Sequence, residues 1–234
     1  MSLDRATEVE KFDHYAASYR ETHQASVRLS GEAPEYFSLH KLACLERDGV
    51  RRDVRLLDYG CGTGTLLGLA SAKFDHLSGY DPSSESLAVA RRQAPAANFY
   101  SDEAAIPDAA FDVAILSGVL HHVPPAERSR VVSGVASKLA PGGRLFIFEH
   151  NPNNPVTRRA VRDCPFDDDA ILLPPHEVRA LLQVAFASVR QDYVLFFPRA
   201  LAPLRPLEPL LRWFPLGAQT LTTGVVRERA GRPT

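Results

Sequence analysis

The stretch of sequence that decides the fold is Leu56-Leu57-Asp58-Tyr59-Gly60-Cys61-Gly62-Thr63-Gly64-Thr65-Leu66. It begins as a short apolar run, as buried strands do, and continues into a loop with glycine at alternate positions before a helical pattern starts. Glycine lets the backbone turn sharply and approach a ligand closely, and the following helix N-terminus offers free N–H groups. Asp81 ends the next expected strand, where a carboxylate can accept hydrogen bonds from both hydroxyls of a ribose. The pattern therefore indicates a nucleoside site.

The spacing of this loop separates it from two better-known nucleotide loops. It reads GxGxG, with Thr65 where the third glycine of the dinucleotide pattern GxGxxG would stand. Asp58 precedes the loop, where it would repel a pyrophosphate but orient an amino-bearing ligand. No GK[ST] follows, which excludes a P-loop. For the glycine loop alone, a tight strand–helix turn without a ligand remains the alternative.

Outward from this loop, short apolar runs alternate with segments of helical period, which is typical of βαβ units in a mostly parallel sheet. The expected strands are Val54–Tyr59, His76–Tyr80, Ala97–Tyr100, Phe111–Leu116, Gly143–Glu149, Val189–Phe197 and Thr220–Arg227. A helix is expected to begin at Pro124 and Pro125 and to stop at Pro141-Gly142-Gly143. Apolar residues at helical spacing predict another helix over Pro174–Phe186. The fold class is thus α/β, a doubly wound and mostly parallel seven-stranded sheet of the Rossmann-like kind.

The chain is expected to form a single domain, 1–234, with 51–149 as the cofactor-binding core. Residues 1–50 read as an N-terminal helical lid. Residues 150–174 and 198–217 are insertions expected on the substrate side, because such sheets bind ligands outside the carboxyl ends of their strands.

Composition and charge exclude several classes of function. The 234 residues are 45% hydrophobic and 24% charged with a net charge of −1, so neither disorder nor bulk nucleic-acid binding is expected. The three cysteines show no CxxC spacing, which suits a reducing compartment. No run approaches the length of a membrane span, and the sequence MSLDRATEVEKFDHY carries no apolar leader-type run, so the expected location is the cytoplasm.

Several ordered motifs together give a resemblance to a known family. The glycine loop resembles motif I of the class I S-adenosylmethionine-dependent methyltransferases, and the resemblance continues in order along about two thirds of the chain. The further matching segments are Gly79-Tyr80-Asp81-Pro82-Ser83, Ser101-Asp102-Glu103-Ala104-Ala105-Ile106-Pro107, Phe111-Asp112-Val113-Ala114-Ile115-Leu116-Ser117 and Val119-Leu120-His121-His122-Val123. By the same analogy the last strand is expected to run antiparallel.

The resemblance implies S-adenosylmethionine as methyl donor, S-adenosylhomocysteine as product, and a set of binding residues. Gly60, Cys61 and Gly62 would wrap the methionine part, with Asp58 near its amino group. The remaining cofactor-binding assignments are Asp81 with Pro82 at the ribose, Asp102 with Glu103 at the adenine, and Ser117 near the sulfonium. No metal is expected.

Other residues have a possible functional role for which a purely structural role is the alternative. His122 is expected to face the cofactor or the acceptor, although a histidine pair after a strand is as often simply packed. His122, Glu149 and His150, all at expected strand ends, are the three candidate catalytic bases; for Glu149 and His150 the alternative is loop solvation or capping of the following turn. Tyr19, in the lid-like segment 12–19, and Lys41 are candidate cofactor contacts; helix packing and a surface lysine are the respective alternatives.

The insertions leave the methyl acceptor open. The three aspartates Asp167-Asp168-Asp169 could bind a metal, but they lack the spacing of an EF-hand, and a solvated acidic turn is the favoured interpretation. Residues 198–217 alternate leucines and aromatics with arginines and prolines. The favoured interpretation of this segment is an extra helix that caps the core and is broken by prolines. The alternative is peripheral membrane contact through 199–216.

The sequence thus predicts methyl transfer from S-adenosylmethionine to a small-molecule or lipid-like acceptor. The alternatives are a non-catalytic module that binds the same nucleoside and, less favoured by GxGxG and Asp58, a nucleotide-dependent oxidoreductase.

Overall fold

The computed structural model describes residues 10, 11, 13 and 19–227. Its α-helices are α2 (Tyr19–Ser26), α3 (Pro34–Arg47), α4 (Thr65–Ala70), α5 (Ser84–Gln93), α6 (Arg128–Lys138), α7 (Pro155–Arg162), α8 (Pro175–Ala185) and α9 (Glu208–Leu211). Its strands are β1 (Arg55–Tyr59), β2 (His76–Tyr80), β3 (Asn98–Tyr100), β4 (Phe111–Ser117), β5 (Leu139–His150), β6 (Ser188–Val194) and β7 (Gln219–Val225). Short 3-10 turns link them, among them Leu120–His122, Pro165–Asp167 and Arg199–Leu207.

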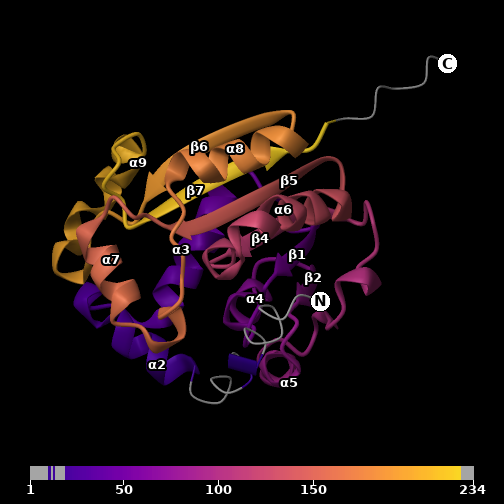
Figure 1. Ribbon diagram of the computed structural model, residues 1–234, viewed down its shortest axis with the longest axis horizontal. Coiled ribbons are helices and arrows are strands. Elements are labelled where there is room, and N and C mark those ends of the chain that lie inside the picture. Colours follow the sequence, from indigo (N-terminus) through magenta and orange to yellow (C-terminus); the bar gives the residue numbers. More distant parts are fainter. Residues whose placement is uncertain (1–9, 12, 14–18, 228–234) are drawn as a thin grey trace.

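The strands form one seven-stranded sheet in the order β3-β2-β1-β4-β5-β7-β6 (Figure 1). Neighbouring strands run parallel except around β7, which is antiparallel to both β5 and β6. The doubly wound sheet and its antiparallel last strand are therefore confirmed. From β1 the chain winds out to β2 and β3 and then returns to β4 on the other side of β1. This reversal brings the carboxyl ends of β1 and β4 together, where such sheets bind ligands.

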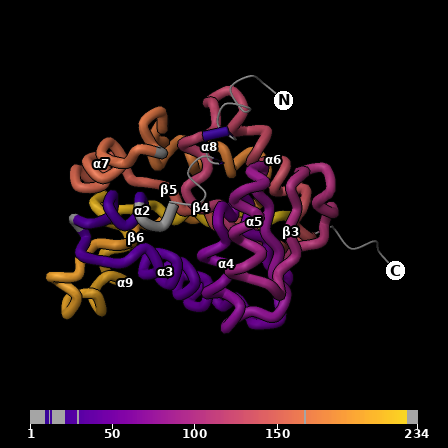
Figure 2. The backbone as a smooth tube through the Cα atoms, turned by 90° about the horizontal axis from the view of Figure 1, so that it is seen from below, coloured from indigo at the N-terminus to yellow at the C-terminus, as the bar shows by residue number. Residues whose placement is uncertain are grey.

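Alternating side chains of each strand fill two cores, one on each face of the sheet. Leu56 of β1 belongs to the core with Leu42 of α3 and Leu67 of α4, all buried. Leu57 points to the other face and joins Val132 of α6. Figure 2 shows α3 and α4 on one side of the strands and α6 and α8 on the other. Both faces are covered, which explains why the central strands read as continuous apolar runs.

Some boundaries differ from those that the sequence predicts. β5 begins at Leu139 and runs through the Pro-Gly-Gly segment that was expected to break the chain, because a register shift against β4 absorbs the irregularity. α6 begins at Arg128 rather than at Pro124 and Pro125; a 3-10 turn over Pro125–Glu127, with Pro124 just before it, precedes the helix. β6 ends at Val194, because Leu195 takes a left-handed φ of 63°.

Helices α2 and α3 confirm helical structure in the described part of 1–50. Most of the lid-like segment 12–19 lies outside the described residues, and so does the side chain of Tyr19. Its predicted roles as lid and cofactor contact therefore stay predictions.

The two insertions are bound to each other (Figure 1, α7 and α9). Asn151 is fully buried and donates from Nδ2 to the carbonyls of Pro215 and Gly217 at 3.0 and 2.7 Å. Asn154 donates to the carbonyl of Leu216 at 2.7 Å. The asparagines of the HNPNNP segment thus hold the chain that enters β7.

The connection from β6 to β7 is not the core-capping helix favoured from the sequence. Its 3-10 segment Arg199–Leu207 contains no buried residue, and Leu210 and Trp213 are 71% and 75% exposed. The prolines keep the segment irregular, and its leucines consequently face outward. Among the described residues, no helix combines the length and the apolar content that crossing a membrane requires.

Candidate functional site

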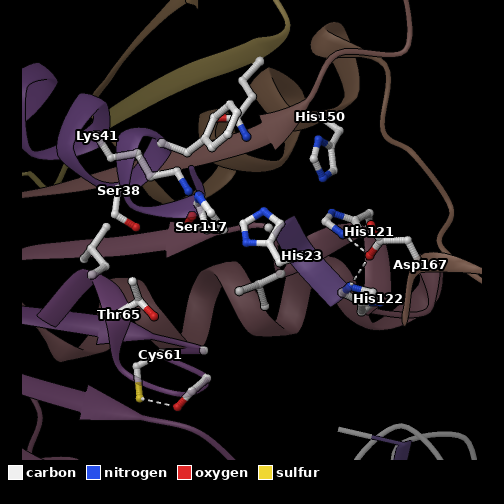
Figure 3. Close-up of a pocket in the computed structure, with 18 of the residues that line it drawn as sticks. His23, Ser38, Lys41, Cys61, Thr65, Ser117, His121, His122, His150 and Asp167 are labelled. Carbon is white, nitrogen blue, oxygen red and sulfur yellow. Dashed lines mark hydrogen bonds and ion pairs between the residues drawn. The ribbon is translucent and has the colours of Figure 1, made fainter. Parts of the chain in front are cut away.

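A cavity of about 380 Å³ lies at the carboxyl ends of the central strands. The glycine loop and Asp81 form one part of its wall, and α2 and α3 contribute His23, Ser38 and Lys41 (Figure 3). His121, His122, His150 and Asp167 gather on the opposite side from Lys41 and Thr65 (Figure 3). The cavity therefore joins the predicted nucleoside-binding loop to a polar cluster.

The glycine loop is wedged between neighbouring elements. The backbone N–H groups of Gly60 and Cys61 both donate to the carbonyl of Tyr80, at 2.7 and 2.9 Å. Gly64 has a φ of 79°, and a Cβ on it would lie 2.8 Å from Cα and Cβ of Ala90 in α5. Only glycine meets both conditions, so the loop sequence follows from its packing as well as from ligand approach.

Asp81 connects this loop to the end of β2. Its Oδ2 accepts from the N–H of Gly62 at 2.8 Å, and its Oδ1 accepts from the N–H of Ser83 at 2.9 Å. Burial raises the pKa of Asp81 to about 6, against the lowering effect of these two backbone N–H groups. Pro82 follows it in the cavity wall, so the predicted ribose-binding pair faces the cavity.

Asp58 and Lys41 form a second polar pair in the wall. Asp58 is buried, and its Oδ1 has no hydrogen-bond partner among the described residues. Burial raises the pKa of Asp58 to about 7, although the charge of Lys41 acts in the other direction. Burial lowers the pKa of Lys41 to about 8, although the negative charges of Asp58 and Glu149 act to raise it. An unpartnered buried carboxylate at a cavity is suited to receive an ammonium group.

Two further predicted contacts lie in this wall, and two do not. Ser117 at the end of β4 lines the cavity, as does Cys61, whose thiol pKa is raised by burial. The buried thiol agrees with its interpretation as a small packing residue rather than a nucleophile. Asp102 and Glu103 do not line the cavity; Asp102 accepts from the N–H of Ala104 and caps a 3-10 turn. Their assignment to the adenine stays a prediction.

The polar cluster centres on His121, which the sequence motif contained but which was not singled out. Glu149 accepts from His121 Nδ1 at 2.7 Å and from the N–H groups of Val119 and Leu120 at 3.2 and 2.8 Å. Burial alone would lower the pKa of His121, but Glu149 and Asp167 raise it to about 10. Burial would raise the pKa of Glu149, and His121 holds it below the ordinary value.

Asp167 corrects the interpretation of the aspartate run as a solvated turn. It is buried and faces His121 Nε2 at 3.6 Å and His122 Nε2 at 3.3 Å. These histidines lower its pKa against the opposing effect of burial. Only Asp168 and Asp169 are exposed, and both pair with Lys11.

Of the three candidate catalytic residues, two reach the cavity. His122 and His150 line it, whereas Glu149 lies behind His121 and does not. Burial lowers the pKa of His122, and it lowers that of His150 to about 4, assisted by the charge of His121. His23 of α2 is a lining residue that the sequence analysis missed, because nothing in a single polar helix marks its one inward histidine.

Comparison with known proteins assigns the family. A family model described as a methyltransferase domain matches residues 20–202. A ubiquinone biosynthesis O-methyltransferase from Aromatoleum aromaticum is 29% identical over 170 residues, which are 65% of this chain and 65% of the relative. An uncharacterized methyltransferase from Staphylococcus carnosus is 28% identical over 144 residues, 60% of this chain and 67% of that one. This chain thus spans about two thirds of the length of these relatives.

Solved structures show the same fold. A S-adenosylmethionine-dependent methyltransferase from Thermotoga maritima superposes with a TM-score of 0.68 at 18% identity, covering 93% of this chain and 99% of that one. Magnesium protoporphyrin IX methyltransferase from Synechocystis, with bound S-adenosylmethionine, gives 0.63 at 19% identity, covering 97% and 99%. The chain belongs to the S-adenosylmethionine-dependent methyltransferase family. The family assignment removes the support for the oxidoreductase alternative.

Proposed function

We propose that this chain transfers the methyl group of S-adenosylmethionine to a hydroxyl group of a small, partly apolar acceptor. The observation that carries the proposal is that one cavity joins Asp58, Asp81 and the glycine loop to the polar cluster of His121, His122, His150 and Asp167. S-adenosylmethionine supplies a sulfonium methyl group that is already electrophilic. The protein's main task is therefore to bind and orient the two reactants, and that positioning supplies much of the rate.

The donor half of the cavity fits the methyl donor. The unpartnered Oδ1 of buried Asp58 is suited to its ammonium group. Asp81 offers a carboxylate to ribose hydroxyls while Gly62 and Ser83 keep that carboxylate in place. Gly60, Cys61, Gly62, Pro82 and Ser117 complete this half, with Lys41 beside Asp58.

The acceptor half is formed by the histidines. His122 and His150 line it and are proposed to contact the acceptor. Glu149 acts through His121 and is proposed as a positioning residue, because its carboxylate is held by three donors away from the cavity. The O-methyltransferase names of several relatives support oxygen as the accepting atom.

The outward-facing leucines and Trp213 support a lipid-like acceptor delivered at a membrane surface. Leu201, Leu204 and Leu207 expose between 41% and 48% of their surface beside still more exposed Leu210 and Trp213. Apolar side chains interleaved with arginines are typical of segments that lie in a membrane interface. We propose that residues 199–216 make this peripheral contact, and that the chain works as one methyltransferase domain, 1–234. Three buried free cysteines support placing it in the cytoplasm.

The test begins with calorimetric titration of S-adenosylmethionine and S-adenosylhomocysteine into wild type, Asp81→Ala and Asp53→Ala. Asp53 is exposed, pairs with Arg51 and lies outside the cavity wall, so it serves as the matched control. We expect saturable binding to wild type and the control, and a loss of at least tenfold in Asp81→Ala. Absence of binding to the folded wild type would refute the proposal.

Turnover is then measured with methyl-labelled donor and a panel of phenols and long-chain alcohols. Transfer of the labelled methyl group to an oxygen atom of the acceptor supports the proposed O-methyltransferase activity. Donor binding without turnover on any acceptor would favour the non-catalytic binding module instead.

A further inference from the structure

Three cavity-lining side chains outside the donor half converge on one point. One ligand atom from each of His121, His150 and Asp167 lies within 4.8 Å of the other two. Figure 3 shows these side chains pointing toward one another from different segments, β5, the turn after β4 and the turn 165–167. Convergence of two imidazoles and a carboxylate from three segments is the arrangement of a metal site.

The separation of His121 and Asp167 is long for a direct hydrogen bond and suitable for a shared ion. His121 Nε2 lies 3.6 Å from Asp167 Oδ1, beyond the usual range of N–H···O contacts. Two ligands bound to one cation at about 2.1 Å in tetrahedral geometry stand about 3.4 Å apart. The space between His121 and Asp167 therefore matches a cation better than it matches a direct contact.

The contact of Glu149 with the other ring nitrogen of His121, and the local charge, support the same conclusion. Glu149 accepts from His121 Nδ1 at 2.7 Å, which directs Nε2 toward Asp167 and the cavity. Histidine ligands of metals commonly donate their other ring N–H to a carboxylate in this way. Glu149 and Asp167 are both buried carboxylates, and a divalent cation between the side chains would offset their negative charge.

We propose that His121, His150 and Asp167 bind a divalent transition-metal cation of the Zn²⁺ type, contrary to the expectation from sequence that no metal is needed. Imidazole nitrogens favour such ions over Mg²⁺ or Ca²⁺. All three residues line the cavity, so the cation keeps a coordination position open toward it, as catalytic rather than closed structural sites do. That position would hold an oxygen of the acceptor; this last step rests on the proposed function.

The test uses chelator-treated full-length protein, with Zn²⁺ titrated by calorimetry and Co²⁺ followed by its visible absorption. Neither measurement requires donor, acceptor or turnover. We expect one ion per chain and a Co²⁺ spectrum that reports nitrogen ligands. Asp167→Asn and His150→Asn should each weaken Zn²⁺ binding by at least tenfold.

Asp168→Asn is the matched control, because Asp168 is the neighbouring, exposed aspartate and pairs with Lys11. It should bind Zn²⁺ as wild type does. Retained S-adenosylhomocysteine binding shows that each variant is folded and separates failure here from failure of the proposed function. The inference is overturned if wild type binds no Zn²⁺ saturably, or if both Asp167→Asn and His150→Asn bind it unchanged.

Discussion

Asp81 accepts a hydrogen bond from the backbone N–H of Gly62 at 2.8 Å, so the end of β2 directly holds the glycine loop that follows β1. The other carboxylate oxygen accepts from Ser83, at the N-terminus of α5. One buried side chain thus joins the loop, a strand end and a helix start around the donor half of the cavity. Ligand-binding groups are most effective when such fixed contacts hold them in place before the ligand arrives.

Donor affinity is expected to depend on pH through Asp58. The pKa of its buried carboxyl is about 7, above the ordinary value of 3.8, so the free protein holds Asp58 mostly neutral at pH 6. An ammonium group favours the ionised form. The affinity for S-adenosylhomocysteine should therefore rise between pH 5.5 and 7, approaching tenfold per pH unit at the acidic end, and then level off. Calorimetry across this range measures it.

Asp58→Asn provides the control for this titration. Lys41 and Asp81, whose pKa values are about 8 and about 6, remain in the variant, so the difference from wild type isolates Asp58. We expect the variant to bind about 10- to 100-fold more weakly at pH 7.5, the cost of one charged hydrogen bond, with a flatter pH profile. An equally steep profile in Asp58→Asn would assign the dependence to another group.

Gly64→Ala should destabilise the fold as well as the site. The new Cβ would meet Cα and Cβ of Ala90 at 2.8 Å, and φ at this position is 79°. Strain and overpacking together predict a loss of about 2–4 kcal/mol in the free energy of unfolding, measured with urea. Gly49→Ala is the matched control: its φ is 73°, but no atom of the described residues lies within 4 Å of the added Cβ. It should cost only about 1 kcal/mol; equal losses would rule out packing against α5 as the reason for Gly64.

The fold and the donor half could be predicted from sequence because their signals are local. Continuous apolar runs mark the strands, and the glycine loop with Asp81 marks the edge where they end. The histidine cluster depends instead on Asp167, which a turn far along the chain brings to His121. Within the run Asp167-Asp168-Asp169, nothing local distinguishes the buried aspartate from its two exposed neighbours. The outward orientation of the leucines in 199–216 could not be predicted either, because apolar residues at that spacing fit a core helix equally well.

Arg128 is expected to be the main anchor of the turn that carries His121 and His122. Its buried guanidinium donates to the carbonyls of Leu120, Val123 and Ile171 at 2.8 to 3.1 Å and pairs with Glu177. Lysine cannot reproduce this planar set of donors. Arg128→Lys should therefore lose about 2–4 kcal/mol of unfolding free energy, since the buried carbonyl of Leu120 and two partly buried carbonyls would lose their partner.

Arg130→Lys, two residues away and half exposed, is the control for this loss. Its pairs with Glu103 and Glu127 are 3.5 Å long, and the change should stay within about 0.5 kcal/mol. Urea unfolding compares the two. A small loss in Arg128→Lys would show that the turn after β4 is held by other contacts.

Vesicle binding should depend on the apolar side chains of the β6–β7 connection. Leu210 and Trp213 are 71% and 75% exposed, so replacing both with glutamate places two charges in the proposed interface without disturbing a core. In co-sedimentation with vesicles of phosphatidylcholine and phosphatidylglycerol, the double variant should lose most of the bound fraction seen for wild type. Val184→Glu is the matched control, because Val184 is a 77% exposed apolar residue on α8, a different element. Its bound fraction should equal that of wild type. Equal binding by all three proteins would refute the proposed membrane contact of residues 199–216. A loss in Val184→Glu alone would assign the membrane contact to α8 instead.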